Sequence, residues 1–150
     1  MSDNVTPPLL SEAELLARFS KTKPPFMDVL GGEFIAADAK AGTATFLYTI
    51  GHNLCHSGGI VQGGFVTAML DAAMAHAIFA ASGYTLRPPT LEIKVSFFEP
   101  AHPGKLKAVA RLIRRGKSIA FLEADLYDEA GTLLARGTST VKLVPLERNK

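Results

Sequence analysis

Cysteine is nearly absent from this 150-residue chain, which contains only Cys55. A single cysteine excludes an internal disulfide framework and fits a reducing compartment. Its four histidines and Cys55 do not fall into zinc-ligand spacing, so we expect no metal site. The N-terminus also lacks a basic segment followed by an apolar run, which is the mark of a signal peptide. We therefore expect a cytoplasmic protein.

An excess of charge of either sign is missing as well. The formal net charge is +2, and no basic stripe with interleaved aromatic residues occurs, which argues against nucleic acid as a partner. Hydrophobic residues make up 47% and charged residues 20% of the chain, as in ordinary globular proteins. The length fits one domain that is large enough to bury a core.

The most unusual stretch runs from Asn53 to Ala81, where a glycine-rich loop leads into a helix that is apolar on nearly all sides. Between Phe65 and Ala81 the only polar side chains are Thr67, Asp71 and His76. Such a helix must be enclosed by protein or lipid. A membrane span needs about 20 apolar residues, whereas this helix begins at a Gly-Gly pair and carries a carboxylate near its middle. We therefore expect a buried core helix and no membrane partner.

Asp71 is the residue of this helix whose presence most needs an explanation. A carboxylate in the middle of a buried helix costs several kcal/mol unless it is paired or hydrogen-bonded. At about 100° per residue, Gly64 lies about 20° and Thr67 about 40° from the direction of Asp71. Because the first turn of a helix offers unpaired N–H groups and a partial positive charge, this stripe suits a carbonyl held between N–H donors and a carboxylate. The competing interpretation is a carboxylate satisfied by Thr67 and loop N–H groups for structural reasons.

His76 has two interpretations. As a partner of Asp71 it would form an acid/base pair of the dehydratase kind. The two residues stand five apart, however, which places them about 140° apart on a continuous helix. This geometry favours a histidine in the core or at an interface.

Outside the apolar helix the pattern predicts two short helical segments and six strands. Ser11 and Glu14 have capping-box spacing for a helix that ends near Lys21. The expected strands cover residues 33–37, 43–50, 90–98, 106–114, 118–127 and 133–144, and residues 26–30 form a further helical turn. Because the links between successive strands are short, the sheet is antiparallel. The predicted fold is α+β, with an antiparallel sheet curled around the central apolar helix. We divide the chain into an N-terminal arm and short helix at 1–22, with a loose arm at 1–10, and a single domain at 23–150.

Alternation is clearest in the strand at residues 90–98. One face is apolar and carries Leu91, Ile93, Val95 and Phe97, and the other is mixed and carries Glu92, Lys94, Ser96 and Phe98.

The order of these elements, with Gly59-Ile60-Val61-Gln62-Gly63-Gly64 followed seven residues later by Asp71, resembles the hotdog-fold acyl-CoA thioesterases of the phenylacetate-degradation type. The likeness extends from the first hairpin to the last strand and includes residues 90–101, 115–117 and 135–138. It implies hydrolysis of an acyl-CoA thioester to free acid and coenzyme A, with no cofactor beyond the coenzyme A of the substrate. It also implies self-association, as a homodimer or dimer of dimers, with the active site between subunits.

The resemblance assigns roles to individual residues. Asp71 would be the general base or the nucleophile, and Gly63 would supply the oxyanion N–H, with Gly64 beside it. Thr90 would orient the attacking water, although it is also a natural residue to begin a strand. Arg115-Gly116-Lys117 would meet the nucleotide end of coenzyme A, although a solvated hairpin tip has the same composition.

Two positions depart from the family pattern. Gln62 stands where the commonest motif has histidine, and glutamine can hydrogen-bond a substrate carbonyl or the loop but cannot titrate near neutral pH. His56 stands where the family often has asparagine, with Asn53 three residues earlier. We expect His56, Asn53 and Thr67 to contact the substrate.

Two alternative functions and the acyl group remain open. The missing histidine at Gln62 keeps a non-catalytic acyl-CoA-binding protein as the alternative, and an acyl-CoA hydratase is disfavoured by the spacing of Asp71 and His76. An apolar acyl pocket, for a medium-chain or aromatic group, is expected around small and large side chains of the helix: Ala68, Ala72, Ala75, Phe65, Met69, Met74 and Phe79.

Overall fold

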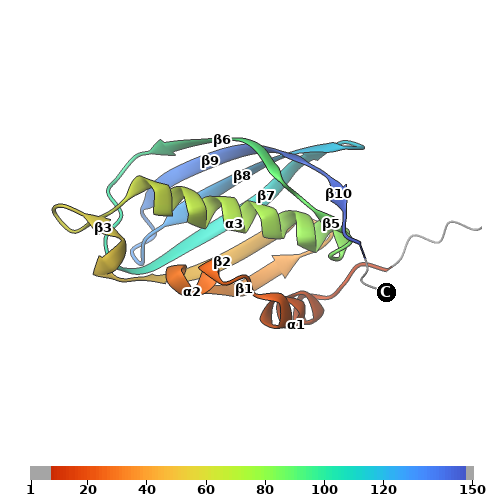
Figure 1. Cartoon of the computed structure of the whole chain (residues 1–150), viewed down its shortest axis with the longest axis horizontal. Helices are drawn as coiled ribbons and strands as arrows, with labels where there is room; N and C mark the ends of the chain where they lie inside the picture. Colours follow the sequence, from red (N-terminus) through yellow and green to blue (C-terminus); the bar gives the residue numbers. More distant parts are fainter. Residues whose placement is uncertain (1–7, 148–150) are drawn as a thin grey trace, which may run out of the picture.

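The computed structural model describes residues 8–147, in which a six-stranded antiparallel sheet curls around one long helix, α3 (Gly63–Ser82) (Figure 1). This confirms the expected α+β class. Most of the arm expected at residues 1–10 lies outside the described residues.

The other elements are, in chain order, α1 (Glu12–Thr22), α2 (Phe26–Leu30), β1 (Gly32–Asp38), β2 (Thr43–Ile50), the 3-10 helix η1 (His52–Leu54), β3 (Cys55–His56), β4 (Ile60–Val61), β5 (Leu86–Arg87), β6 (Thr90–Phe97), β7 (Gly104–Arg115), β8 (Ile119–Tyr127), β9 (Leu133–Lys142) and β10 (Val144–Pro145). The three expected helical segments and six expected strands are confirmed, each within two residues at either end. The two-residue strands β3, β4, β5 and β10 were not predicted, because two residues carry no periodicity.

The N-terminal helix α1 begins with the expected capping box. The Ser11 hydroxyl accepts a hydrogen bond from the Glu14 N–H at 3.2 Å, and the Glu14 carboxylate accepts one from the Ser11 N–H at 2.7 Å. Glu12 accepts a further hydrogen bond from the Ala37 N–H at 3.0 Å, which attaches α1 to strand β1. The helix therefore covers the β1 edge of the sheet.

The strand order is β1-β2-β7-β8-β9-β6, and all pairs are antiparallel. Short links favour pairing between successive strands, and this holds for β7, β8 and β9. It fails for β6, which pairs with β9 while β7 pairs with β2. The link at residues 98–103 instead crosses the end of the sheet. Three strand spacings of about 4.8 Å are well within its extended reach, so a short link need not be a hairpin.

Helix α3 lies close to the sheet because the strands beneath it present small side chains. Six inward-facing positions of the central strands are buried alanines: Ala44, Ala108, Ala110, Ala120, Ala124 and Ala135. At Gly137 a Cβ atom would lie 3.4 Å from Leu70 and 3.5 Å from Met74, both on the buried face of α3. By length and composition α3 would also suffice to cross a membrane, but it packs inside the curled sheet as the core helix of the domain.

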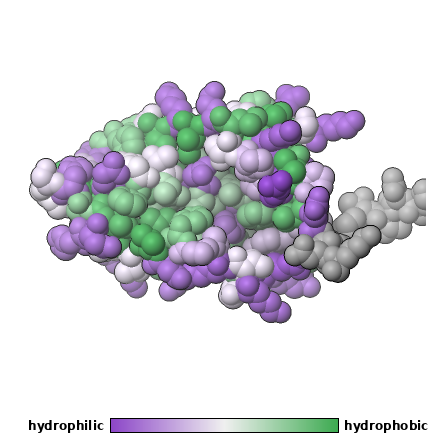
Figure 2. Space-filling model, viewed as in Figure 1, coloured by the Kyte–Doolittle hydropathy of each residue, from purple (hydrophilic) through white to green (hydrophobic). Residues whose placement is uncertain are grey.

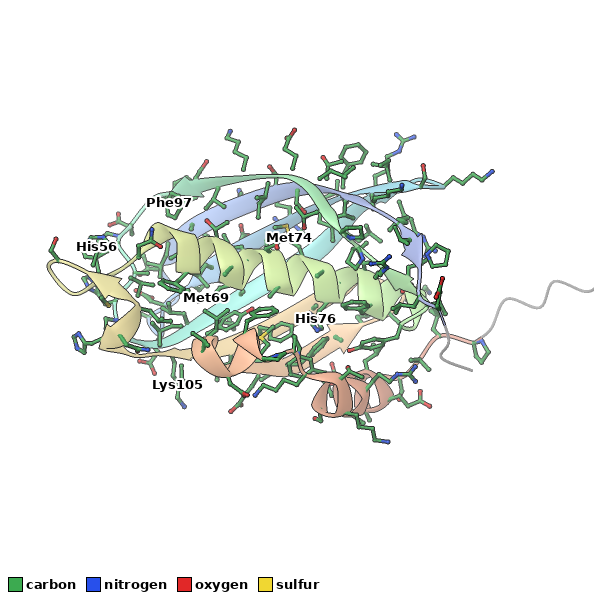
Figure 3. The ribbon with its side chains drawn as sticks, in the orientation of Figure 1. His56, Met69, Met74, His76, Phe97 and Lys105 are labelled. Atoms are coloured by element: carbon green, nitrogen blue, oxygen red, sulfur yellow. The ribbon has the colours of Figure 1, made fainter. Side chains whose placement is uncertain are left out.

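His76 belongs to the core, as its position on the helix predicts. It is 6% exposed, and its Nδ1 lies 2.8 Å from the carbonyl oxygen of Ala72. Four phenylalanine rings surround it at centroid distances of 4.8 to 5.4 Å: Phe19, Phe34, Phe46 and Phe79. Burial lowers the pKa of this imidazole to about 4, so it is neutral at pH 7. Figure 3 shows it within the layer between α3 and the β1 side of the sheet.

Candidate active site

The start of α3 leaves one backbone N–H without a partner. Gln62 is the N-cap, and its side-chain Oε1 accepts a hydrogen bond from the Gly64 N–H at 2.7 Å. The N–H groups of Phe65 and Val66 donate to the Gln62 carbonyl oxygen. Within residues 8–147 no group accepts from the Gly63 N–H. The expected pair of glycine donors is therefore reduced to Gly63, and the Gln62 side chain caps the helix.

Asp71 and Thr90, which lie on different elements, are brought together. The Thr90 hydroxyl, at the first position of β6, donates a hydrogen bond to Asp71 Oδ1 at 2.8 Å. Asp71 is half-buried on α3, whereas Thr90 is exposed at the edge of the sheet. Thr90 thus holds one carboxylate oxygen of Asp71, and the other oxygen accepts no hydrogen bond from the described residues.

A β-bulge turns Thr90 toward the helix. Thr90 pairs with Val141 and Glu92 with Thr140, so Leu91 is an extra residue that has no opposite number in β9. Strict alternation placed Leu91 on the apolar face of the strand. That prediction is wrong for Leu91, because the bulge puts it at the surface, 59% exposed, while Thr90 lies over Asp71.

Thr67 does not present a free hydroxyl group in the stripe that contains Asp71. Its Oγ1 donates to the Gly63 carbonyl oxygen at 2.9 Å, one turn back in the same helix. The hydroxyl proton is thus used within the helix, and only the oxygen lone pairs remain for a ligand. Thr67 also makes no recorded hydrogen bond to Asp71, so the structural explanation of Asp71 is not supported by this residue.

The loop before α3 brings one of its two candidate residues to the helix start. His56 is exposed in β3, its Nδ1 lies 2.8 Å from the Ser57 carbonyl oxygen, and its side chain lines a cavity that Gly63 also lines. Asn53 is exposed in η1, and its side chain lies over Gly51, with Oδ1 2.8 Å from where a Cβ atom would be. Asn53 is not among the residues that line the cavity.

The cavity beside Gly63 has a volume of about 400 Å3. Its apolar lining includes Ile60, Val66, Phe97, Phe98, Leu134 and Ala135. This differs from the pocket predicted around the helix, because Met69, Ala72 and Met74 are 0 to 5% exposed and face the core. The sequence offered no signal for the cavity, whose walls come from four separate segments of the chain.

Arg115-Gly116-Lys117 forms the exposed tip of the β7–β8 hairpin, closed by a hydrogen bond from the Gly116 N–H to the Ile119 carbonyl oxygen at 2.8 Å. Figure 1 shows this tip at the end of the sheet that is nearer the C-terminus of α3, opposite the end where Gly63 lies. Within one chain, therefore, the basic turn and the helix start are not brought together.

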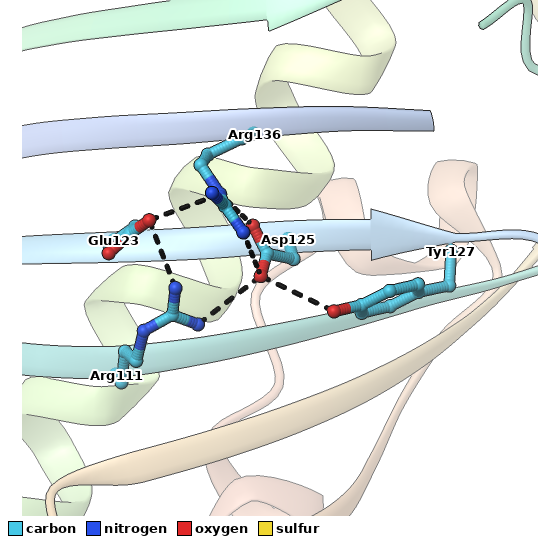
Figure 4. A network of polar contacts seen from close by, with 5 residues as sticks. All are labelled: Arg111, Glu123, Asp125, Tyr127 and Arg136. Atoms are coloured by element: carbon cyan, nitrogen blue, oxygen red, sulfur yellow. Dashed lines mark hydrogen bonds and ion pairs between the residues drawn. The ribbon is translucent and has the colours of Figure 1, made fainter. Parts of the chain in front are cut away.

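A second carboxylate, which sequence reasoning missed, lies on the outer face of the sheet (Figure 4). Asp125 is 3% exposed and accepts hydrogen bonds from Arg136 at 2.6 and 3.1 Å, from Arg111 at 3.4 Å and from the Tyr127 hydroxyl at 3.3 Å. Glu123 forms ion pairs with both arginines, at 3.0 and 3.1 Å. Burial opposes ionisation, but the arginines outweigh it and hold the pKa of Asp125 below its ordinary value. These residues are structural, because α3 and the cavity lie on the other face.

Comparisons with known proteins agree with this fold. The family described as the Thioesterase superfamily matches residues 58–135. The solved structure of a phenylacetic acid degradation-related protein from Ralstonia eutropha JMP134 is 31% identical, with a TM-score of 0.77, over 85% of this chain and 98% of that chain. The E. coli PaaI protein from the phenylacetic acid degradation operon has the same fold, with a TM-score of 0.78 at 18% identity over 89% and 95% of the two chains. A Thermoplasma volcanium protein with the provisional name esterase TV1331 is 28% identical over 66% of this chain and 74% of its own length.

Proposed function

We propose that this chain, which belongs to the thioesterase superfamily, hydrolyses acyl-CoA thioesters to the free acid and coenzyme A. The observation that carries the proposal is the hydrogen bond from Thr90 to Asp71, a residue of α3. The first N–H of the same helix, that of Gly63, has no acceptor within residues 8–147. A carboxylate oriented by a hydroxyl and a free N–H at a helix start are the two groups that attack on a thioester carbonyl requires.

In the proposed reaction the Gly63 N–H donates to the thioester oxygen and stabilises the negative charge that develops on it. Asp71 either takes a proton from an attacking water or attacks the carbonyl carbon itself, forming an anhydride that water then hydrolyses. The carbon–sulfur bond breaks, and the thiolate of coenzyme A leaves and is protonated. Single turnover in 18O-labelled water identifies the second route when water attacks the anhydride at the carboxyl carbon of Asp71, because an unlabelled oxygen of Asp71 then remains in the product acid.

The active site takes Gly63 and Asp71 from different copies of the chain. On one helix they are eight residues apart, about 12 Å of rise, which is too long for direct attack by Asp71 on a carbonyl bound at Gly63. The free edge of the sheet, β6, lies beside Asp71 and exposes Leu91, Phe97 and Phe98 to 52–59%. Figure 2 shows apolar side chains gathered along this face, over β6 and beside the start of α3. We infer that a second copy covers it.

The charges of β6 favour one register for that contact. With antiparallel strands and a two-fold axis at Ile93, Glu92 of each copy lies opposite Lys94 of the partner subunit. An axis at Glu92 or at Lys94 would place like charges opposite each other. This arrangement would also bring the basic turn at residues 115–117 of one copy into reach of the other copy, where it would bind the phosphates of coenzyme A.

A charge exchange tests this contact. Glu92→Lys and Lys94→Glu should each weaken the dimer about tenfold, because two symmetric pairs become repulsive. The double variant Glu92→Lys/Lys94→Glu should restore it. The dissociation constants are measured by sedimentation at low salt. Two single variants that dimerise as tightly as the wild type would contradict the register.

Two other functions compete with this proposal. A non-catalytic acyl-CoA-binding protein is supported by Gln62, which replaces a titratable histidine and caps Gly64. An acyl-CoA hydratase would need a second acid/base group beside Asp71, and His76, the candidate for that role, is buried among phenylalanine rings instead.

The deciding experiment is free-thiol release from short, medium, long and aryl acyl-CoA esters, with wild type and Asp71→Asn side by side. We expect turnover with at least one class of ester and its loss in the variant. Saturable binding of coenzyme A esters without thiol release would identify a binding protein. Hydration of an enoyl-CoA without thiol release would identify a hydratase.

The single cysteine and the coenzyme A substrate are consistent with a cytoplasmic location.

A further inference from the structure

The cavity beside Gly63 is separate from the pair formed by Asp71 and Thr90, and neither of those residues lines it. It opens between the start of α3, the loop at 56–61, the end of β6 and the start of β9. Its volume of about 400 Å3 falls in the range of small-molecule sites, roughly 300–1,000 Å3. The proposed mechanism uses only one atom of its wall, the nitrogen of Gly63.

The position of Gly63 determines which part of a thioester enters the cavity. If the thioester oxygen binds the Gly63 N–H, the carbonyl carbon lies beside the cavity, and one of its two substituents, the acyl chain or the sulfur, can enter the cavity. Coenzyme A carries phosphates, which are bound by lysine or arginine. Among the lining residues that the structure describes, none is lysine or arginine, and Glu99 is the one with a full charge. The apolar acyl group is therefore the part that fits.

Phe97 stands at the entrance to this cavity. It points inward from β6, opposite Ala135, and its ring atoms Cζ and Cε1 lie 3.3 and 3.4 Å from where a Cβ atom of Gly63 would be. The ring is nevertheless 55% exposed. One side of the ring thus covers the start of α3, and the other side belongs to the face that the second copy is proposed to cover. Figure 3 shows Phe97 above the first turn of α3, with His56 at the same end of the molecule.

The geometry points to Phe97 as the residue that limits acyl size, with the cavity beneath it as the binding site of a neutral, apolar acyl group. This deepens the proposed function and rests on it. Access to the Gly63 N–H passes the Phe97 ring, so removing the ring widens the route for long or bulky chains. The carboxylate of Glu99 at the same cavity disfavours acyl groups that end in a carboxylate, because like charges repel.

The test compares Phe97→Ala with a matched control. Phe121→Ala removes a ring of the same kind from β8 that is 47% exposed on the outer face of the sheet, away from α3. Thiol release is measured with hexanoyl-, dodecanoyl- and adipoyl-CoA. Phe97→Ala should raise the ratio of kcat/KM for dodecanoyl over hexanoyl by about tenfold or more, while Phe121→Ala should leave it within about twofold of wild type. Adipoyl-CoA should react at least about tenfold more slowly than hexanoyl-CoA, which has the same chain length.

Binding measurements separate this inference from the proposed reaction. The S-hexyl and S-dodecyl thioethers of coenzyme A cannot be hydrolysed, so calorimetric titration reports on the cavity even if no ester turns over. A shift of relative affinity toward the dodecyl ligand in Phe97→Ala supports the inference whether or not hydrolysis occurs. If the wild type releases thiol but Phe97→Ala changes neither the kcat/KM ratio nor the affinity ratio of the two chain lengths, the role of Phe97 is overturned. The thioesterase proposal then stands. Equal rates with adipoyl- and hexanoyl-CoA overturn the neutral acyl class. Phe97→Leu serves if the alanine variant fails to fold.

Discussion

Asp71 and Asp125 are two carboxylates in one small domain, and they differ in how many hydrogen bonds they accept and in how deeply they are buried. Asp125 accepts hydrogen bonds from two arginines and a tyrosine and is 3% exposed. Asp71 accepts one, from the Thr90 hydroxyl, and is half-buried at the free edge of the sheet. Burial alone would therefore have selected Asp125 and not Asp71, the residue that we propose to be reactive. A carboxylate is available for chemistry when its neighbours leave an oxygen without a partner and a ligand can reach it.

The largest expected effect concerns Asp71. Asp71→Asn keeps the shape of the side chain and its contact with Thr90 but removes the base or nucleophile. The rate should fall by about 10³-fold, with the urea midpoint within experimental error of wild type. Thiol release and urea unfolding of the same preparation check both statements. An unchanged rate would show that the carboxylate is structural, like Asp125.

Asp125→Asn should have the reverse effect, on stability rather than rate. Breaking a buried ion pair costs about 3–5 kcal/mol, but the side chains of Arg111 and Arg136 are 35% and 43% exposed. The loss of unfolding free energy should therefore be nearer about 2 kcal/mol, with activity per folded molecule unchanged. Urea denaturation measures the loss, and a variant as stable as wild type would contradict it.

The pH dependence of that loss follows from the pKa of Asp125, which is lower in the folded protein than in the unfolded chain. The stabilisation is then complete above the unfolded-state pKa, about 3.9, and is lost as the pH falls through the folded-state pKa. The difference between wild type and Asp125→Asn should be constant from about pH 7 to 5 and shrink below about pH 4. A difference that grew with acid would have the wrong sign.

The smallest effects concern the hydroxyl partner of each carboxylate. Thr90→Val should lower kcat about tenfold, or about 1.4 kcal/mol, and leave stability unchanged, because it removes orientation from an exposed position. Tyr127→Phe should cost about 1 kcal/mol of stability or less and leave kcat unchanged. Steady-state kinetics and urea unfolding are measured on both variants. A loss of stability in Thr90→Val, or a loss of kcat in Tyr127→Phe, would contradict the prediction.

Much of the fold was predictable because its signals are local. The capping box at Ser11 and Glu14, the apolar run of α3 and the turns between strands each lie within a few residues of what they specify. The catalytic assignment of Asp71 was predictable in the same way, from one charged residue in an apolar helix. It stays a prediction, now supported by the hydrogen bond from Thr90.

The features that were missed depend on contacts between distant segments. Strand β6 pairs with β9, about 45 residues later in the chain. The bulge at Leu91 is defined only by this pairing. The Asp125 cluster joins β7, β8 and β9, and the cavity joins four segments. Alternation and spacing within one segment contain no information about such pairings. The motif left two partners open for Gln62, a substrate carbonyl or the loop, and did not identify the Gly64 N–H that it caps.

The pairing of β6 with β9 has a consequence for how the protein is made. Among the described residues β6 has no other strand partner in its sheet, and β9 follows it only after β7 and β8. A ribosome can therefore finish α3 and β6 before Thr90 has a sheet to hold it over Asp71. Synthesis from the N-terminus delivers Asp71 and Thr90 before the strand that supports Thr90. Fragments that stop before β9 should thus contain every residue of the proposed active site and still have no assembled site.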